Sequence, residues 1–248
     1  MRFRGTLLIL SCLAPTGPAA APAAAWAPES RVAIADWAAQ IAPPDLRRQI
    51  ERRASAFRDG VLAPLEPAAD GNPQGGPDGD RGRIERIVRE AERAIALIEE
   101  HRPFDDVVYQ LGIVCQLVAA AANPLEASDG DPQEGRYHDD FLRYALSAEK
   151  RLEPVFYGIP ARSDTEGLRA LIAATLERSR ALYPSVGREY RRIGFADGRR
   201  RFDDRSTAFG VVSVAYSQAI SDAAVALRYI WLRAGGADAR SGLPVRGR

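Results

Sequence analysis

The segment from Phe104 to Pro124 constrains the fold more than any other part of this 248-residue chain. It reads FDDVVYQLGIVCQLVAAAANP, and between its first turn and Asn123 its only polar members are Gln110 and Gln116. A helix that is apolar on nearly every side is buried at the centre of a protein. The sequence therefore predicts a helical protein built around this segment.

Apolar residues recur at helical spacing in several other segments. The expected helices cover residues 31–41, 45–60, 83–101, 104–124, 137–156, 163–183 and 206–233. No stretch alternates apolar and polar residues as a half-buried strand does. We expect an all-α bundle of about six to eight helices with no significant sheet.

Several residues mark the ends of these helices. Pro43-Pro44 ends the first helix and Gly60 the second, while Gly235-Gly236 closes the last. Ser163-x-x-Glu166 has the form of a capping box, and the helix that it opens is expected to be interrupted near Pro184.

Loops and tails divide the chain into one helical domain, 26–234, and its flanking segments. Residues 61–82 contain four Pro and five Gly and are expected to form a mobile loop. The basic tail, 235–248, is expected to be disordered. A chain of this length can bury a core that needs no disulfide.

The first 25 residues have the layout of a secretory signal. Arg2 and Arg4 precede a short apolar run from Leu7 to Leu13, and three alanines before Trp26 provide an A-x-A cleavage site. An alternative is a lipoprotein signal in which Cys12 carries the lipid. No later segment is long, apolar and uncharged enough to suggest a transmembrane span. We expect a periplasmic or secreted protein that begins at Trp26.

Charge and cysteine content exclude some classes of protein. The full chain has 34 basic and 33 acidic residues, and once residues 1–25 are cut off it has 32 basic and 33 acidic residues. A nearly neutral chain has no strong nucleic-acid signature, because such binding depends on an excess of positive charge. The same cut leaves Cys115 as the only thiol, inside an apolar helix where a thiol is usually inert. There is neither a G-x-S-x-G motif nor a phosphate-binding Gly-rich loop.

The spacing of residues between Leu111 and Tyr144 resembles a known family. Leu111-Gly112 is followed by Gln116 and Ala120, which are four positions apart. The tripeptide Pro124-Leu125-Glu126 comes next, and then His138 and Leu142, which are again four positions apart. In the superfamily of zinc-dependent phospholipases C and single-strand-specific nucleases, these positions read His-x-x-x-Asp, Pro-Leu-His and His-x-x-x-Glu or Asp. Trp26 and the Ala-rich first helix also resemble the mature N-terminus of that family.

The resemblance implies an all-helical fold around three zinc ions. The family holds them with imidazoles, carboxylates and the amine and carbonyl of the N-terminal Trp. Side chains four residues apart share one helix face and can aim at one metal cluster. Such a cluster activates water and neutralises phosphate charge in phosphodiester hydrolysis.

Most of the implied ligands are replaced in this chain. The first His position holds Arg31, and the others hold Gln116, Ala120 and Leu142. The family's acid after the second helix aligns at Leu65, with Asp59 or Glu66 as alternatives. Trp26, Glu126 and His138 remain as candidate metal residues.

Metal binding is therefore not expected, although zinc or calcium is an alternative. The chain has only two histidines, His101 and His138, fewer than the family's cluster uses. His101 is interpreted as a solvated helix end. His138 could still bind one ion together with nearby acids, which are Asp129, Asp131, Asp139 and Asp140. The alternative is that these acids only stabilise the N-terminus of a helix through its dipole.

Arg31 and Glu126 suggest how the helices could hold together without zinc. One hypothesis is that the Arg31 guanidinium replaces part of the metal charge and pairs with Glu126. The alternative is that Arg31 points into solvent, as most arginines do.

Three functions remain open from the sequence. The first is a degenerate, non-catalytic relative of the zinc enzymes with a binding or structural role. The second is a phosphodiester hydrolase with a reduced or altered metal site. The third is an unrelated helical module that binds a partner protein or an apolar ligand. The partner is unknown in each case.

Overall fold

The computed structural model describes residues 26–64, 77–127, 131–160, 164–195 and 197–237. Within these ranges the chain forms helices and no strand, which confirms the all-α prediction. The α-helices are α1 (Pro28–Ile41), α2 (Pro44–Arg52), α3 (Ala54–Leu62), α4 (Pro77–Glu99), α5 (Phe104–Ala121), α6 (His138–Ala148), α7 (Thr165–Ile193), α8 (Gly198–Arg201) and α9 (Thr207–Arg233). Three short 3-10 helices are η1 (Pro124–Ala127), η2 (Glu134–Arg136) and η3 (Glu149–Arg151).

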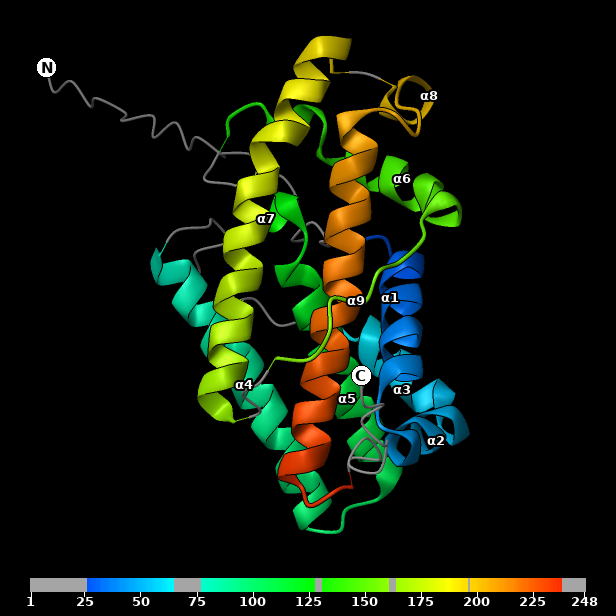
Figure 1. The fold of residues 1–248 in the computed structure, drawn as a ribbon, viewed down its shortest axis with the longest axis vertical. Helices are drawn as coiled ribbons and strands as arrows, with labels where there is room; N and C mark the ends of the chain where they lie inside the picture. The colour runs from blue at the N-terminus through cyan, green and yellow to red at the C-terminus, as the bar shows by residue number, and fades with distance from the viewer. Residues whose placement is uncertain (1–25, 65–76, 128–130, 161–163, 196, 238–248) are drawn as a thin grey trace, which may run out of the picture.

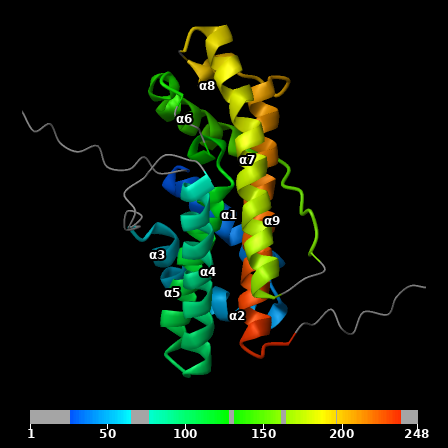
Figure 2. The same cartoon turned by 90° about the vertical axis from the view of Figure 1, so that its left-hand side faces the viewer.

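The long helices form two antiparallel pairs. Helices α7 and α9 lie side by side over most of their length (Figure 1), and α4 packs along α5. Figure 2 shows the two pairs as neighbouring layers. Helix α5 also contacts α3, α9 and α1, which confirms its predicted central position. Its Gln110 amide donates to the Glu90 backbone oxygen at 3.1 Å, so this buried polar group has a partner.

Two helices are long and apolar enough to cross a membrane by length and composition, contrary to the expectation that no segment would be. These are α5 and α9, and 67% and 72% of their most apolar 18-residue windows are buried inside the protein. Core helices of a folded domain share this composition, because they are buried on nearly every side.

The predicted helix over residues 45–60 is two helices. The chain breaks at Arg53, where φ is −128° and ψ is 35°, and neither Gly nor Pro marks the break. Arg53 Nε lies 2.8 Å from Asp105 Oδ1, and its guanidinium lies over the Phe104 ring at 5.3 Å. The break thus coincides with contacts to the start of α5, which no local sequence signal reveals. This split and the single-turn α8 raise the number of α-helices among the described residues to nine.

The loop between α3 and α4 is shorter than the predicted range of residues 61–82. Val61 and Leu62 complete α3, because Val61 is fully buried in the core. Residues 77–82 form the first turns of α4, where Asp80 Oδ2 lies 2.5 Å from Arg180 of α7. Residues 65–76 of the predicted loop lie outside the described residues, as do the whole predicted signal, 1–25, and residues 238–248 of the tail.

Three expected helix ends differ in the structure. Asp164, not Ser163, caps α7, and its Oδ1 accepts from the Gly167 backbone N–H at 2.7 Å. Helix α7 continues through Pro184, which is exposed, so water can satisfy the carbonyl that proline leaves without a donor. The helix expected to reach Phe156 ends before Leu152. The predicted start of the last helix near residue 206 is confirmed, and Ser206 is its N-cap, since its Oγ accepts from the Phe209 N–H at 3.2 Å.

Residues 152–160, which we call the strap, run without helical structure across α9 (Figure 1). Pro154 lacks the N–H that a helix needs. Hydroxyl groups of α9 supply partners instead: Ser217 Oγ accepts from the Val155 N–H at 3.2 Å, and Ser221 Oγ accepts from the Tyr157 N–H at 3.1 Å. The two serines are four apart and so share one face of α9.

A buried carboxyl group joins α7 to α9. Asp222 of α9 is 3% exposed, and its carboxyl accepts from Thr175 Oγ1 at 2.5 Å and Gln218 Nε2 at 2.7 Å. Arg178 Nη2 lies 3.2 Å from the same group. Burial raises the pKa of Asp222, and these three neighbours oppose the shift.

We expect the free energy of unfolding of Asp222→Asn, compared with that of the wild type, to increase as pH rises. Because the folded-state pKa is raised, the folded protein holds this proton more tightly than the unfolded chain does. This tighter proton binding stabilises the folded protein fully below the pKa of an aspartate in the unfolded chain, about 3.9. The stabilisation is lost as pH rises through the pKa of Asp222 in the folded protein. Urea unfolding of both proteins between pH 4 and pH 7 measures the difference. A difference that does not change with pH would contradict the prediction.

Candidate functional site

Three positions from the family pattern meet in one apolar cluster. Trp26 is 1% exposed, and its Nε1–H donates to the Ala119 backbone oxygen at 2.8 Å. Ala120 of α5 and Leu142 of α6 pack against the same cluster. The places where the family holds two carboxylate ligands therefore carry apolar side chains in contact with the core.

Two other polar positions lie buried or half-buried without a full set of partners. Gln116 is 4% exposed, and its Oε1 has no hydrogen-bond partner among the described residues. The Nε of Arg31 is likewise buried without a partner in this part of the chain. Burial lowers the pKa of Arg31, and Glu29 opposes the shift.

The predicted ion pair between Arg31 and Glu126 does not form. Arg83 occupies that role: its Nη2 lies 3.8 Å from Glu126 Oε2, and its Nη1 donates to the Glu126 backbone oxygen. The physical reason is that α4 begins before Arg83 and brings the first turns of that helix to η1. Arg83 was not predicted as a partner of Glu126, because the residues before Arg83 were expected to form a loop.

Glu126 and His138 are close enough for their charges to affect each other, and Glu134 contacts His138 directly. His138 Nδ1 lies 3.0 Å from Glu134 Oε1, and this hydrogen bond raises the pKa of His138 against the effect of burial. Burial raises the pKa of Glu126, while the charges of Arg83 and His138 oppose the shift. The Nε2 atom of His138 is buried and has no partner among the described residues.

Two tyrosines extend this polar cluster, and sequence analysis did not single them out. The hydroxyl groups of Tyr137 and Tyr183 lie 2.8 Å apart. Tyr137 also lies 3.2 Å from Asp131 Oδ2, and Tyr183 lies 3.0 Å from Glu134 Oε2. The two hydroxyl groups thus form a chain of contacts that links Asp131 to Glu134. Burial raises the pKa of Tyr137 to about 12.

The other acids named from the sequence do not join this cluster as ligands. Asp140 accepts from Tyr190 Oη and from the Gly198 backbone N–H, both at 2.8 Å. Asp139 and Asp59 are exposed. Leu65, Glu66 and Asp129 lie outside the described residues. No three His, Cys, Asp or Glu side chains in the described ranges are arranged to hold a metal ion.

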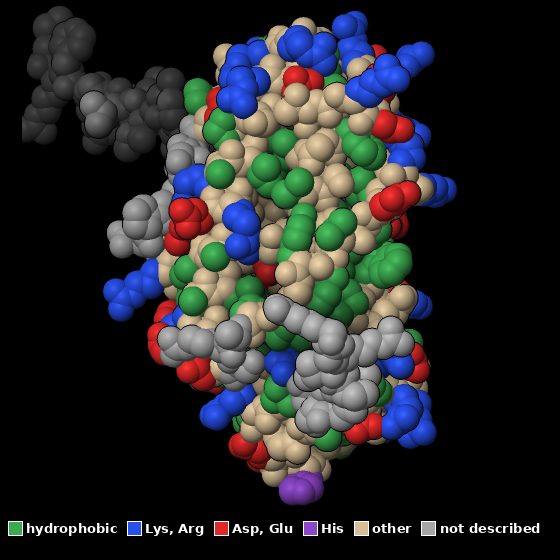
Figure 3. Space-filling view, in the orientation of Figure 1, with side chains coloured by type: hydrophobic (Ala, Val, Ile, Leu, Met, Phe, Trp, Pro, Cys, Tyr) green, Lys and Arg blue, Asp and Glu red, His purple; other side chains and the backbone are tan. Residues whose placement is uncertain are grey.

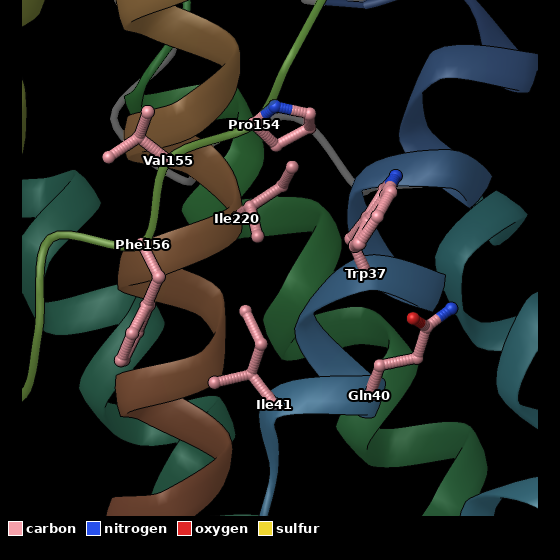
Figure 4. A pocket seen from close by; sticks show the side chains of 7 residues that line it. All are labelled: Trp37, Gln40, Ile41, Pro154, Val155, Phe156 and Ile220. Atoms are coloured by element: carbon pink, nitrogen blue, oxygen red, sulfur yellow. The ribbon is translucent and has the colours of Figure 1, made fainter.

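A separate, apolar pocket lies between α1, the strap and α9. It has a volume of about 310 Å³ and is lined by Trp37, Gln40, Ile41, Pro154, Val155, Phe156 and Ile220. Figure 4 shows Trp37 and Gln40 on α1, with the strap residues on the other side of the pocket. Trp37 is 43% exposed and Val155 54% exposed, so the rim of the pocket is apolar and open to solvent.

The exposed apolar rim was not predicted, because Trp37 fits the apolar stripe of the first helix and Val155 falls within an expected helix. Pro154 was the one local signal against that helix. Large exposed apolar groups around a concave surface are typical of a binding site.

Comparisons of this chain with models of protein families, with curated proteins and with solved structures found no match.

Proposed function

We propose that this chain is an exported, non-catalytic binding protein related to the zinc-dependent phospholipases C and single-strand-specific nucleases. The observation that carries the proposal is the meeting of Trp26, Ala120 and Leu142 in one apolar cluster. These residues are far apart in sequence, yet they stand at positions that would converge on the metals of that family. Their place in or against one apolar cluster supports the relationship, and their apolar character argues against catalysis.

The loss of catalysis follows from the chemistry of the replaced positions. Alanine and leucine offer no atom to a metal ion, and the glutamine amide is a poor substitute for an imidazole ligand of zinc. Glu126 already has a cationic neighbour in Arg83, at 3.8 Å. Without a metal cluster, nothing in this region would activate water and neutralise a phosphodiester together.

The purified protein that begins at Trp26 is expected to contain no stoichiometric zinc and to leave phosphodiesters intact. Elemental analysis and a chromogenic phosphodiester, assayed with added Zn²⁺, Ca²⁺ or Mn²⁺, measure both properties. A matched variant restores the family ligands through Arg31→His, Gln116→His, Ala120→Asp, Glu126→His and Leu142→Glu. If this variant folds by circular dichroism, we expect it to bind zinc.

The two halves of that experiment test different parts of the proposal. Stoichiometric zinc or turnover in the natural chain would contradict the loss of catalysis. A folded variant that fails to bind zinc would contradict the family relationship instead.

A second candidate is a hydrolase with an altered metal site, and one observation favours it. The unpartnered Nε2 of His138 lies in a region where Glu126 and Glu134 both perturb the pKa of the imidazole. An imidazole with two carboxylates nearby could take a single ion after a rearrangement of side chains. Turnover that His138→Ala abolishes would favour this candidate over the first.

The apolar pocket is the binding site that we propose for the non-catalytic role. An apolar side chain or ring would bury itself against Trp37, Val155 and Ile220, with the Gln40 amide at the rim. Trp37 is the strongest candidate for an anchoring contact, since aromatic residues dominate binding energies at such sites.

Trp37→Ala is expected to weaken the binding of an aromatic probe, such as anilinonaphthalene sulfonate, by about tenfold, because it removes one wall of the pocket. Fluorescence titration measures the affinity. Tyr109→Ala is the matched control, since Tyr109 is 39% exposed on α5 and does not line the pocket. Equal weakening by both changes would show that the probe binds elsewhere.

A further inference from the structure

Positive charge is concentrated at one end of this nearly neutral protein. Between residues 188 and 205 there are seven arginines and four acids, whereas the whole chain has a formal net charge of +1. These residues form the end of α7, the short helix α8 and the approach to α9. Figure 3 shows Lys and Arg side chains gathered over the upper end of the molecule, where Figure 1 places α8.

Most of these arginines form no ion pair within the described part of the chain. Arg192 pairs with Glu189 at 2.9 Å, and Asp204 is paired with Arg151. The six others are exposed and form no ion pair with a described residue; they are Arg188, Arg191, Arg199, Arg200, Arg201 and Arg205. We call these six residues the basic end. Their positive charge is therefore free to act on an external partner.

The fold holds the basic end in a defined position. Asp140 accepts from the Gly198 N–H and from Tyr190 Oη, both at 2.8 Å, and so fixes the start of α8 to α6 and α7. A Cβ atom at Gly198 would lie 2.6 Å from the Asp140 carboxyl, so only glycine fits this approach. Phe202, directly after α8, is buried at 4% exposure. The three arginines of α8 therefore project from an anchored turn.

The shape and chemistry of the basic end favour a surface of phosphates over a strand of nucleic acid. The arginines cover the outside of a helix end, where they are exposed to solvent. Base stacking needs exposed aromatic rings, but Phe202 and Tyr190 are buried and Arg136 covers the Phe195 ring at 3.9 Å. Guanidinium groups bind phosphate oxygens in pairs and are attracted to anionic membranes.

We propose that the basic end docks this protein onto an anionic lipid surface through the phosphate headgroups. The long axis of the molecule would then point away from the membrane. The apolar pocket between α1, the strap and α9 would remain accessible, because it lies on the side of the bundle (Figures 1 and 4). This inference depends on the charges alone and stands whether or not the proposed function is correct.

Co-sedimentation with lipid vesicles tests the proposal on the chain that begins at Trp26. We expect binding to equal mixtures of phosphatidylglycerol and phosphatidylcholine, and none to phosphatidylcholine alone. The triple variant Arg199→Gln, Arg200→Gln and Arg201→Gln should bind about 100-fold more weakly. The matched control changes the same number of exposed arginines elsewhere, through Arg52→Gln, Arg93→Gln and Arg102→Gln, and should bind as the wild type does.

Each other outcome would overturn the proposal. These outcomes are equal binding to both kinds of vesicle, equal weakening by both triple variants, and binding to single-stranded DNA but not to vesicles. The wild type provides a measurement that does not depend on how the variants fold, because its vesicle binding should fall steeply as salt rises. Binding that is insensitive to salt would also contradict docking through the arginines.

Discussion

Replacing Trp26 with alanine is expected to lower the free energy of unfolding by about 3 to 5 kcal/mol. The Trp26 ring is 1% exposed and contacts Tyr216 edge to face, with ring centroids 6.3 Å apart. Removing it would leave a cavity between the start of α1 and the end of α5, and would leave the Ala119 carbonyl without its donor. Urea unfolding followed by circular dichroism measures the loss.

The variant Trp26→Phe separates the hydrogen bond from the packing. It keeps most of the ring volume and loses the N–H group, so we expect a cost of about 1 to 2 kcal/mol. If both variants unfold at the wild-type urea concentration, Trp26 does not anchor the fold. That result would also weaken the proposed relationship, which depends on Trp26 lying within this cluster.

The second large effect is expected from Gly112→Ala. Helices α3 and α5 cross so closely that a Cβ atom on Gly112 would overlap the Phe57 backbone oxygen, and one on Gly60 would overlap the Tyr109 backbone oxygen. Backbone atoms cannot move aside as a flexible side chain can. The two helices would have to separate, at a cost of about 3 kcal/mol or more.

Gly210→Ala is the matched control for this change. Gly210 lies in α9, and a Cβ atom there would meet nothing within 4 Å. The control should therefore stabilise the helix by about 0.5 to 1 kcal/mol, through the better helix propensity of alanine. Thermal unfolding of both variants gives the comparison. Similar stabilities would mean that α3 and α5 do not pack through their glycines.

The candidate site was only partly predictable. Glu126 and His138 were expected to share a site and do perturb each other's pKa. Their actual partners were not expected. Arg83 is 43 residues from Glu126 in the chain, and Tyr183 is 49 residues from Glu134. No pattern in one sequence reveals which charged residue of a distant helix will face a given carboxylate.

The strap shows the same limit at the level of secondary structure. Residues 152–156 were expected to continue the preceding helix, and Pro154 was the only contrary signal among them. The serines that bind its backbone, Ser217 and Ser221, lie more than 60 residues later on α9. The extended conformation of the strap depends on contacts with α9, and so does the apolar pocket. The sequence of the strap itself does not reveal these contacts.

The sequence by itself determined the helical class, the buried centre at α5 and the start of α9 near Ser206. These features depend on the helical period and on hydrogen bonds between residues only a few positions apart. The tertiary structure alone decided the break at Arg53, the ion pair of Glu126 with Arg83 and the anchored basic end. Such features depend on which helix faces come together, because ion pairing and burial act between residues that are close in space and distant in the chain.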